Sequence, residues 1–569
     1  MVEAINQIYK HRQDFILIGL TGKIGAGCTT TADFLSKDIS EHNLPDICIT
    51  DKSTDDDRKR YIVQKFYNKN WKPFIKIIAS DVITSFLLEN DFQTVQAFLS
   101  NKGLKQFDLT FEEEYQKLSD KLQSLNFEFR KNTDNFHYVT TTLPDVSQQI
   151  KEALGIDEDY DNYAKAYQIF GDNIRQFGSA VDENNPDAKN IYTISTRINQ
   201  FIKIIHSKNK DDENPTYIVI DAFRNPFEVM FFKERYSAFY LMGIHAEQKH
   251  IEDRLSRKSN MNPKDIEKMH KKETSKDTVD KETSFVSQNI PVCIQKSDIY
   301  ISNNGLYGEA IGHEFYGQVI KFISLIQHPG LITPSLDEKM MQIAHTAKLN
   351  SACLSRQVGA CITNENGSLK GIGWNSVAEG QTPCLLRSTD ELLQGTKSSS
   401  YSEYEKSEKF TTSLVDFQKH INVDNLKGRN VSFCFSEIHN KYANKESNGE
   451  QDCKCDKNQV HTRSLHAEEN AFLQIAKYGG EGIKNGTLYS TASPCELCSK
   501  KAYQLGIKKV VYIDLYPGIA QSQILNTGLY PPKVVLFKGA IGTAYHKLYD
   551  PILSYKDELN ALSINAEKE

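Results

Sequence analysis

The chain has 569 residues, of which 25% are charged and 39% hydrophobic, which is ordinary for a globular protein with more than one domain. Its net charge of -6 gives no general attraction to nucleic acid or to an anionic membrane. No apolar run approaches about 18 residues, and Met1 to Asp14 lacks the apolar centre of a signal peptide, so we expect a cytoplasmic protein without a membrane segment.

A strand predicted over Phe15 to Leu20 leads into a glycine-rich segment and then into a helix. In this arrangement backbone N–H groups and a helix N-terminus converge on a phosphate. The spacing fits a phosphate-binding loop at four positions: Gly22, Gly25, Gly27 and Thr29. Cys28, however, stands where such a loop needs a lysine, so phosphoryl transfer is not expected.

Three later segments add to this pattern. The strand Tyr217 to Asp221 with its Arg-Asn-Pro turn, the segment Gly171 to Gly178, and the strand within Gln288 to Asn304 resemble parts of the P-loop nucleotide kinases. The resemblance implies a kinase-like domain with a parallel sheet over residues 1–326, and it places Asp221 at a nucleotide site. A nucleotide sensor and a purely architectural relic are both compatible with a loop that lacks its lysine.

A linker near Gln327 to Gly330 opens a second domain, expected over residues 327–569. It begins with a helix over Leu336 to Leu349 and a hairpin across Asn366-Gly367, the strongest short hairpin signal. The later predicted elements are a helix from His466, a strand over Thr487–Thr491, a helix at Cys495, and strands over Val510–Asp514 and Lys533–Phe537. This order predicts a three-layer α/β/α domain around a mixed sheet, so the whole chain is of the α/β class.

The second domain contains His466-Ala467-Glu468 and, further on, Pro494-Cys495-Glu496-Leu497-Cys498. This order of residues is the signature of zinc-dependent nucleobase deaminases. One imidazole and two thiolates suit Zn²⁺ and leave its fourth position free for water. We therefore predict His466, Cys495 and Cys498 as ligands of a catalytic zinc.

Glu468 is predicted to be the catalytic acid and base, which takes a proton from the attacking water and delivers protons to the ring nitrogen and the departing amine. The alternative is that the two cysteines form a redox pair or half of a structural zinc site. Neither has a use for a glutamate two residues after the histidine. The signature therefore favours a hydrolytic deaminase that releases ammonia.

Three further segments carry a family resemblance: Ser351 to Ala360, Gly373 to Asn375, and Pro383-Cys384. They resemble the deoxycytidylate deaminases of the cytidine deaminase superfamily over residues 335–384 and 461–550. With a kinase-like domain ahead of it, the chain resembles bacterial anti-phage deoxycytidine nucleotide deaminases. That resemblance implies conversion of dCTP and dCMP to their uridine forms during infection, a homo-oligomer, and a protein or RNA regulator that restrains the activity.

The family resemblance also implies substrate-binding roles for single residues. Asn375 matches an asparagine that holds the substrate sugar, and Tyr516 matches a tyrosine near the base or phosphate. Arg356 is a phosphate contact by position only. The corresponding structural readings are a turn cap for Asn375 and ordinary packing for Tyr516.

Residues 385–460 form an insertion with no place in the minimal family pattern. Within and just after it, Cys453, Cys455 and His461, with Cys434 and Cys384 as companions, fit a second, structural zinc or unpaired cysteines in a flexible loop. The eleven cysteines of the chain are expected to be reduced thiols or metal ligands rather than disulfides. The polar segment Arg387 to Phe410 is expected to be a mobile flap or a partner surface.

The sequence is compatible with three functions. The first is a deaminase of free deoxycytidine nucleotides. The second is a polynucleotide cytosine deaminase, against which the acidic balance counts. The third is a nucleotide- or RNA-sensing regulator whose deaminase fold only binds, and the intact Glu468 counts against it because binding needs no proton carrier.

Overall fold

The computed structural model describes residues 2–123, 133–156, 160–259, 266–267, 270, 273, 283–304, 312–395, 398–440, 462–479, 482–514 and 518–566. The chain divides into two units, of which the first comprises Met1–Pro334 with Lys538–Glu569 and the second comprises Ser335–Phe537. The sequence put one boundary between residues 326 and 327. In the structure the division falls after Pro334, and the C-terminal residues return to the first unit.

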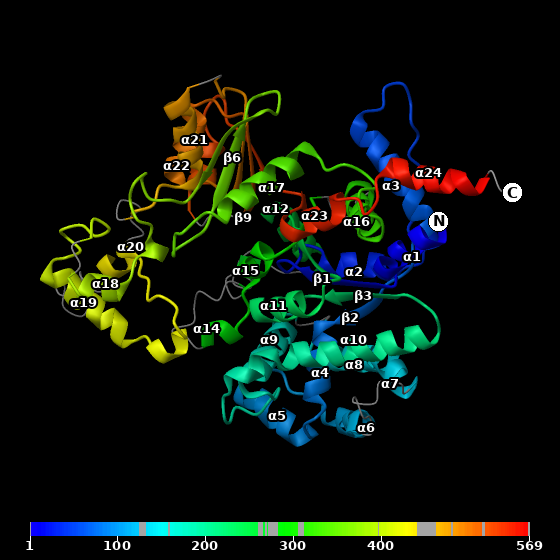
Figure 1. The fold of residues 1–569 in the computed structure, drawn as a ribbon. Coiled ribbons are helices and arrows are strands. Elements are labelled where there is room, and N and C mark those ends of the chain that lie inside the picture. Colours follow the sequence, from blue (N-terminus) through cyan, green and yellow to red (C-terminus); the bar gives the residue numbers. More distant parts are fainter. Residues whose placement is uncertain are drawn as a thin grey trace. The chain divides into compact units, whose positions relative to one another are not determined.

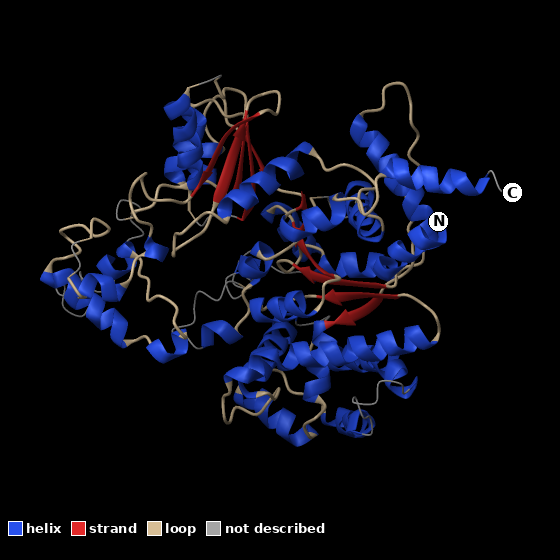
Figure 2. Ribbon diagram, in the orientation of Figure 1, coloured by secondary structure: helices blue, strands red, loops and turns tan. Residues whose placement is uncertain are grey.

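The first unit is built on a six-stranded sheet with the order β11-β5-β4-β1-β3-β2, drawn in red in Figure 2. Its strands are β1 (Phe15–Thr21), β2 (Ile75–Ile78), β3 (Thr216–Asp221), β4 (Phe239–His245), β5 (Ile299–Ser302) and β11 (Gly539–Ala540). The strands pair in parallel except for β11, which pairs antiparallel with β5 and so ties the C-terminal segment to this sheet.

Helices cover both faces of this sheet, which is why its strands are continuously apolar. Leu17, Ile218 and Leu241 face one core, and Ile18, Val219 and Met242, the next residue along each strand, face the other. In Figure 1, α9 and α10 lie on one side of β1 and β3, and α2 and α16 lie on the other. The described α-helices of the unit are α1 (Val2–Gln13), α2 (Cys28–Ser36), α3 (Asp55–Asn70), α4 (Ala79–Leu87), α5 (Phe92–Asn101), α6 (Glu112–Gln123), α7 (Thr133–His137), α8 (Leu143–Ala153), α9 (Tyr160–Phe177), α10 (Thr193–Asp211), α11 (Pro226–Arg235), α12 (Gln248–Ser259), α14 (Thr283–Val286), α15 (Ile290–Gln295), α16 (Gly312–Gln327), α23 (Gly542–Tyr549) and α24 (Tyr555–Ala566).

The second unit contains a five-stranded sheet with the order β10-β9-β8-β6-β7. Its strands are β6 (Gly359–Thr363), β7 (Leu369–Trp374), β8 (Thr487–Ala492), β9 (Lys509–Asp514) and β10 (Lys533–Leu536). Strand β6 is antiparallel to β7 and β8, whereas β8, β9 and β10 run parallel. The predicted mixed sheet is therefore confirmed, and Gly367 takes a positive φ of 79° in the predicted hairpin turn.

Helices lie on both faces of this second sheet. They and the helices of the insertion are α17 (Leu336–Lys348), α18 (Thr389–Leu393), α19 (Glu408–Lys419), α20 (Phe435–Ile438), α21 (Ala467–Tyr478) and α22 (Glu496–Gln504). Two glycines allow α17 to pack closely on β6 and α21 to pack closely on β7. A Cβ at Gly359 would lie 2.0 Å from a carbonyl oxygen of α17, and one at Gly373 would lie 2.1 Å from a carbonyl oxygen of α21. Within the described residues, no helix is both long and apolar enough to cross a membrane.

The described part of the insertion, residues 385–395 and 398–440, folds around a small core of its own. This core consists of Leu392, Tyr401, Phe410, Leu414, Phe433 and Ile438. Arg387 is fully buried, forms an ion pair with Glu405, and lies 4.9 and 4.8 Å from the ring centroids of Tyr401 and Phe433. The segment that was expected to be a mobile flap is therefore packed around this core. Its aromatic side chains contact one another in the fold, although polar residues separate them in the sequence.

Candidate metal centre

Two helix N-termini of the second unit carry the residues of the predicted metal site. His466 immediately precedes α21 and Cys495 immediately precedes α22. The carbonyl oxygen of His466 accepts a hydrogen bond from the Asn470 N–H at 2.9 Å, and that of Cys495 accepts one from the Ser499 N–H at 2.8 Å. The positive end of a helix dipole favours a thiolate, so the first turn of α22 is a suitable place for Cys495 and Cys498.

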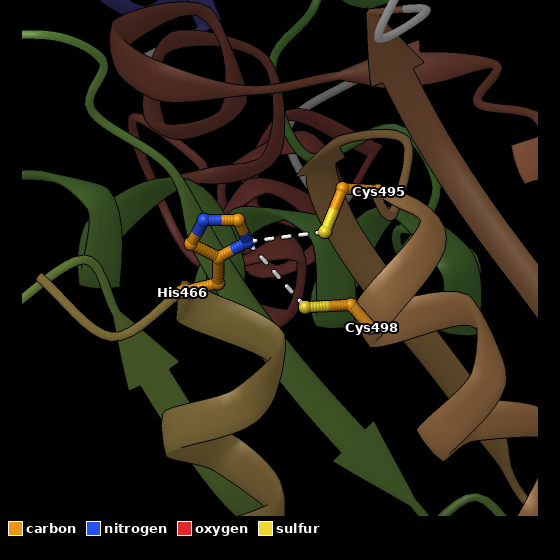
Figure 3. A group of neighbouring side chains, drawn as sticks. All are labelled: His466, Cys495 and Cys498. Carbon is orange, nitrogen blue, oxygen red and sulfur yellow. Dashed lines mark hydrogen bonds between the residues drawn. The ribbon is translucent and has the colours of Figure 1, made fainter. Parts of the chain in front are cut away.

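The three side chains converge, as Figure 3 shows. His466 Nδ1 lies 3.2 Å from the sulfur of Cys495 and 3.6 Å from that of Cys498, and the three donor atoms lie within 4.8 Å of one another. Zn–S and Zn–N bonds of about 2.3 and 2.1 Å at a tetrahedral angle place a sulfur and a nitrogen roughly 3.6 Å apart. The donor set and its spacing therefore fit zinc.

The electrostatics of the two thiols also fit a cation. A hydrogen bond from Cys498, together with one from His466, lowers the pKa of Cys495 to about 3 against the effect of burial. The same hydrogen bond to Cys495, with burial, raises the pKa of Cys498. A dication between the two sulfurs would favour ionisation of both thiols.

Glu468 lies in the first turn of α21 and is 4% exposed. Its carboxylate accepts a hydrogen bond of 2.8 Å from the hydroxyl of Ser490 on β8. Burial raises the pKa of Glu468, and the bond from Ser490 opposes that rise. A raised pKa suits a carboxyl group that has to donate a proton as well as accept one.

A cavity of about 180 Å³ opens beside these residues. It is lined by Thr462, Arg463, Ser464, Leu465, His466, Glu469, Leu497 and Cys498. A small molecule that enters this cavity therefore meets two of the three predicted metal ligands.

The structure also brings Asn375 close to the metal site. Ser376 forms an isolated antiparallel bridge with Leu465, so the segment after β7 runs beside the residue that precedes His466. The side-chain oxygen of Asn375 accepts a hydrogen bond of 2.7 Å from the Val358 N–H, which orients the amide. Arg356 forms an ion pair with Asp514 at the end of β9, and Tyr516 lies outside the described residues.

Ser490 and Arg463 were missed in the sequence. Ser490 is one of several polar residues on a strand, and nothing in the signature indicates which of them faces Glu468. Arg463 lies three residues before the histidine, outside the motif. A basic residue close to a metal-binding motif was the only signal for it.

The fold and the site together define a metal-dependent hydrolytic enzyme of the α/β class. Residues 334–514 match the family model described as the cytidine and deoxycytidylate deaminase zinc-binding region. The chain is 31% identical over 177 residues to the deoxycytidylate deaminase of Enterobacteria phage T2, a match that covers 31% of this chain and 79% of that protein. The chain belongs to the cytidine and deoxycytidylate deaminase family, and zinc is the metal of its family region.

Two further relatives and one solved structure also match parts of the chain. The deoxycytidylate deaminase of Enterobacteria phage T4 is 30% identical over 177 residues, which cover 31% of this chain and 77% of that protein. The deoxycytidylate deaminase of Schizosaccharomyces pombe is 26% identical over 190 residues, which cover 33% of this chain and 40% of that protein. A crystal structure of the dCMP deaminase from the cyanophage S-TIM5 in complex with dCMP and dUMP is 23% identical, with coverage of 36% of this chain and 99% of that chain and a TM-score of 0.21.

In the first unit, the glycine-rich loop lies between β1 and α2. Gly25 and Gly27 take positive φ values of 82° and 113°, and Gly22 lies at the start of the loop. Thr29 hydrogen-bonds to Asp221 at the end of β3, and burial raises the pKa of that aspartate. The five residues that were predicted to form a nucleotide site therefore lie at or just beyond the carboxyl ends of the neighbouring strands β1 and β3.

Protein groups already contact this loop. The carboxylate of Glu273 accepts hydrogen bonds from the Ile24 N–H at 3.0 Å and from Arg224 at 3.1 Å. Arg254 donates to the Gly25 carbonyl oxygen at 3.2 Å. A loop amide that a phosphate would use is thus bonded to a carboxylate of the same chain.

The predicted second metal site lies only partly within the described residues. Cys453, Cys455 and His461 lie outside them. Cys384 and Cys434 are described, and burial is the main cause that raises the pKa of each. Among the described residues, these thiols do not come close enough together with a third donor to form a metal-binding group.

Proposed function

We propose that the protein deaminates free deoxycytidine nucleotides, converting dCMP or dCTP to dUMP or dUTP with release of ammonia. The observation that carries this proposal is the buried carboxylate of Glu468 beside three converging zinc donors. The names of the phage relatives, deoxycytidylate deaminase, support dCMP as a substrate. The order of the two domains, which resembles that of the anti-phage enzymes, supports dCTP.

In the proposed mechanism His466, Cys495 and Cys498 would hold the zinc. Bound there, zinc would act as a Lewis acid and lower the pKa of a water molecule to about 7. Glu468 accepts a proton from the attacking water and donates it to the ring nitrogen next to the reacting carbon. It then carries the second proton of that water to the amino group, which leaves as ammonia while a carbonyl group remains. Water and the cytosine amidine are thereby converted to a uracil ring and ammonia.

Two further residues position the reactants. Ser490 holds the carboxylate of Glu468 by the hydrogen bond of 2.8 Å. Asn375 has its side-chain oxygen bonded to the Val358 N–H, so its amide NH₂ group is turned away from that bond and is proposed to bind the substrate sugar.

The test is incubation of the full chain with dCMP, dCTP and single-stranded DNA, with ammonia and uracil products measured. We expect ammonia from one or both nucleotides and none from DNA. Release from DNA alone would favour the polynucleotide deaminase, and binding of nucleotide without ammonia would favour the regulator.

We propose depletion of the deoxycytidine nucleotide pool in anti-phage defence as the physiological use. Its support is the resemblance in domain order. Cells that express the wild-type chain should resist phage and lose dCTP during infection, whereas cells with Glu468→Ala should do neither. The proposed homo-oligomer is tested by light scattering, and a restraining RNA or protein by its co-purification with the inactive chain.

We also propose nucleotide binding by the first unit, supported by the loop geometry and by the Thr29–Asp221 contact. The carboxylate of Glu273 would have to leave the Ile24 amide before a phosphate could bind there. Titration of a labelled nucleoside triphosphate into the full chain and into Glu273→Ala tests this. If neither the wild-type chain nor Glu273→Ala binds the nucleotide, the loop is an architectural relic.

A second zinc is proposed for the cysteine-rich part of the insertion. Its support is the sequence pattern of Cys453, Cys455 and His461, with Cys384 and Cys434 as companions. Metal analysis of the purified chain should find about two zinc ions per chain if this is correct. A value near one would remove the second site.

A further inference from the structure

Arg463 lines the cavity that also contains His466 and Cys498. Its Nη1 atom is fully buried and, among the residues that the structure describes, has no hydrogen-bond acceptor. A buried guanidinium nitrogen without an acceptor is unfavourable, and a bound anion would remove that cost by accepting its hydrogen bond. Because Arg463 lines the cavity, a rotation of its side chain would bring this unsatisfied nitrogen to a ligand there.

The backbone next to Arg463 is held in place. Leu465 donates a hydrogen bond of 2.8 Å to the carbonyl oxygen of Ser376 and accepts one of 3.4 Å from the Ser376 N–H. Asn375, the proposed sugar-binding residue, is the neighbour of Ser376. The bridge thus joins the segment of Arg463 to the segment that would meet the sugar, and it restricts how far Arg463 can move from the metal site.

The charges around the cavity favour an anionic ligand at Arg463. The carboxylate in the cavity lining, Glu469, forms an ion pair with Lys501. Arg356, the residue that the sequence indicated for phosphate, is paired with Asp514. Within the described part of the chain, Arg463 is therefore the basic residue of the cavity lining whose charge is not already matched by a carboxylate.

We propose that Arg463 binds the 5′-phosphate of the deoxycytidine nucleotide and so makes the enzyme prefer nucleotides to nucleosides. A guanidinium donates two parallel hydrogen bonds to a phosphate, which an ammonium group does not match geometrically. The sugar separates this phosphate from the base, so a ligand held at Arg463 extends its base toward the metal donors that line the same cavity. The proposal rests on the proposed function, because it assigns a specificity residue to that reaction.

The test compares Arg463→Ala with the wild type on dCMP and on unphosphorylated deoxycytidine. We expect kcat/KM for dCMP to fall by about 10- to 150-fold, the range for a lost hydrogen bond to a charged group, while that for deoxycytidine changes less than about twofold. Arg463→Lys should recover part of the loss, since lysine keeps the positive charge but lacks the planar pair of donors that binds a phosphate through two hydrogen bonds. Zinc content and Tm are measured on each variant to exclude unfolding.

Arg429→Ala is the matched control. Arg429 lies in the same unit, outside the cavity lining, and donates to the carbonyl oxygens of Leu426 and Asn425. Its removal should leave both substrates unaffected.

Binding of the products separates this proposal from the function itself. The Kd of dUMP should rise in Arg463→Ala by a factor similar to the loss in kcat/KM, and the Kd of deoxyuridine should stay constant. A loss that is equal for dCMP and deoxycytidine, or no loss at all, would overturn the assignment of Arg463. A wild-type chain that binds dUMP but releases no ammonia from any substrate would instead refute the proposed function.

Discussion

Ser490 donates a hydrogen bond of 2.8 Å to the carboxylate of Glu468 and so joins β8 to the first turn of α21. Both residues are buried, at 0% and 4% exposure. A charge-assisted hydrogen bond between buried groups is strong and directional. The contact therefore holds the carboxylate in one orientation, as the proposed proton transfer by Glu468 requires.

Replacement of Ser490 by alanine should lower kcat by about 10- to 100-fold, because the carboxylate loses a hydrogen bond and its fixed orientation. Zinc content should not change, since Ser490 is not one of the converging donors. Ammonia release measured beside metal content checks both statements. Ser413→Ala, which removes a buried hydroxyl bonded within α19, is the control and should retain full activity. Full activity of Ser490→Ala would show that the hydrogen bond has no part in catalysis.

Replacement of Cys495 or Cys498 by serine should remove one zinc ion per chain and abolish turnover. A hydroxyl group is a poor ligand for zinc at neutral pH, and the remaining two donors bind the ion too weakly. Elemental analysis with a circular dichroism spectrum distinguishes metal loss from unfolding. Cys48→Ser serves as control because Cys48 is exposed and lies in the first unit. Retention of the zinc by both active-site variants would contradict the assigned ligands.

Alanine at Gly373 should destabilise the second unit by about 1–3 kcal/mol, the usual range for overpacking. The new Cβ would lie 2.1 Å from the Ala467 carbonyl oxygen and 2.4 Å from the Ala471 nitrogen, so α21 must move away from β7. Because Glu468 lies on that helix, activity should fall together with Tm. Gly482→Ala, where a Cβ meets nothing within 4 Å, should leave both unchanged. An unaltered Tm for Gly373→Ala would mean that the helix is not tightly packed on the strand.

The buried pair of Arg387 and Glu405 should be the most sensitive charge contact in the insertion. Removal of one partner from a buried pair typically costs about 3–5 kcal/mol, because the other charge is left unpaired. Arg387→Ala should therefore lower the free energy of unfolding markedly, as measured by urea denaturation. Lys419→Ala breaks the exposed Lys419–Asp416 pair and should change it by less than about 1 kcal/mol. Similar effects for both variants would mean that the insertion core contributes little to stability.

The sequence was most informative where local patterns determine the structure. The hairpin around Asn366-Gly367 was predicted correctly, since turn chemistry and strand alternation are local. The approach of His466 to Cys495 could also be predicted, because a shared metal explains why such residue types recur at that spacing. These parts of the site needed no knowledge of tertiary packing.

Contacts between distant segments could not be read from the sequence. The pairing of β11 with β5 depends on two residues that carry no strand signal of their own. The contact of Glu273 with the Ile24 amide joins segments about which local composition says nothing. Burial of Arg387 was also unexpected, because an arginine in a polar segment is normally exposed. It is buried because the rings of Tyr401 and Phe433 pack against its guanidinium group, which only the tertiary structure reveals.

The central claim is that Glu468 carries protons beside a zinc ion that His466, Cys495 and Cys498 hold. The most direct test measures zinc per chain and ammonia release from dCMP for Glu468→Gln. The account predicts that the variant keeps the zinc content of the wild type and loses at least about a hundredfold in kcat, as expected for removal of a general acid and base. Turnover near the wild-type rate in the zinc-loaded variant would contradict the account.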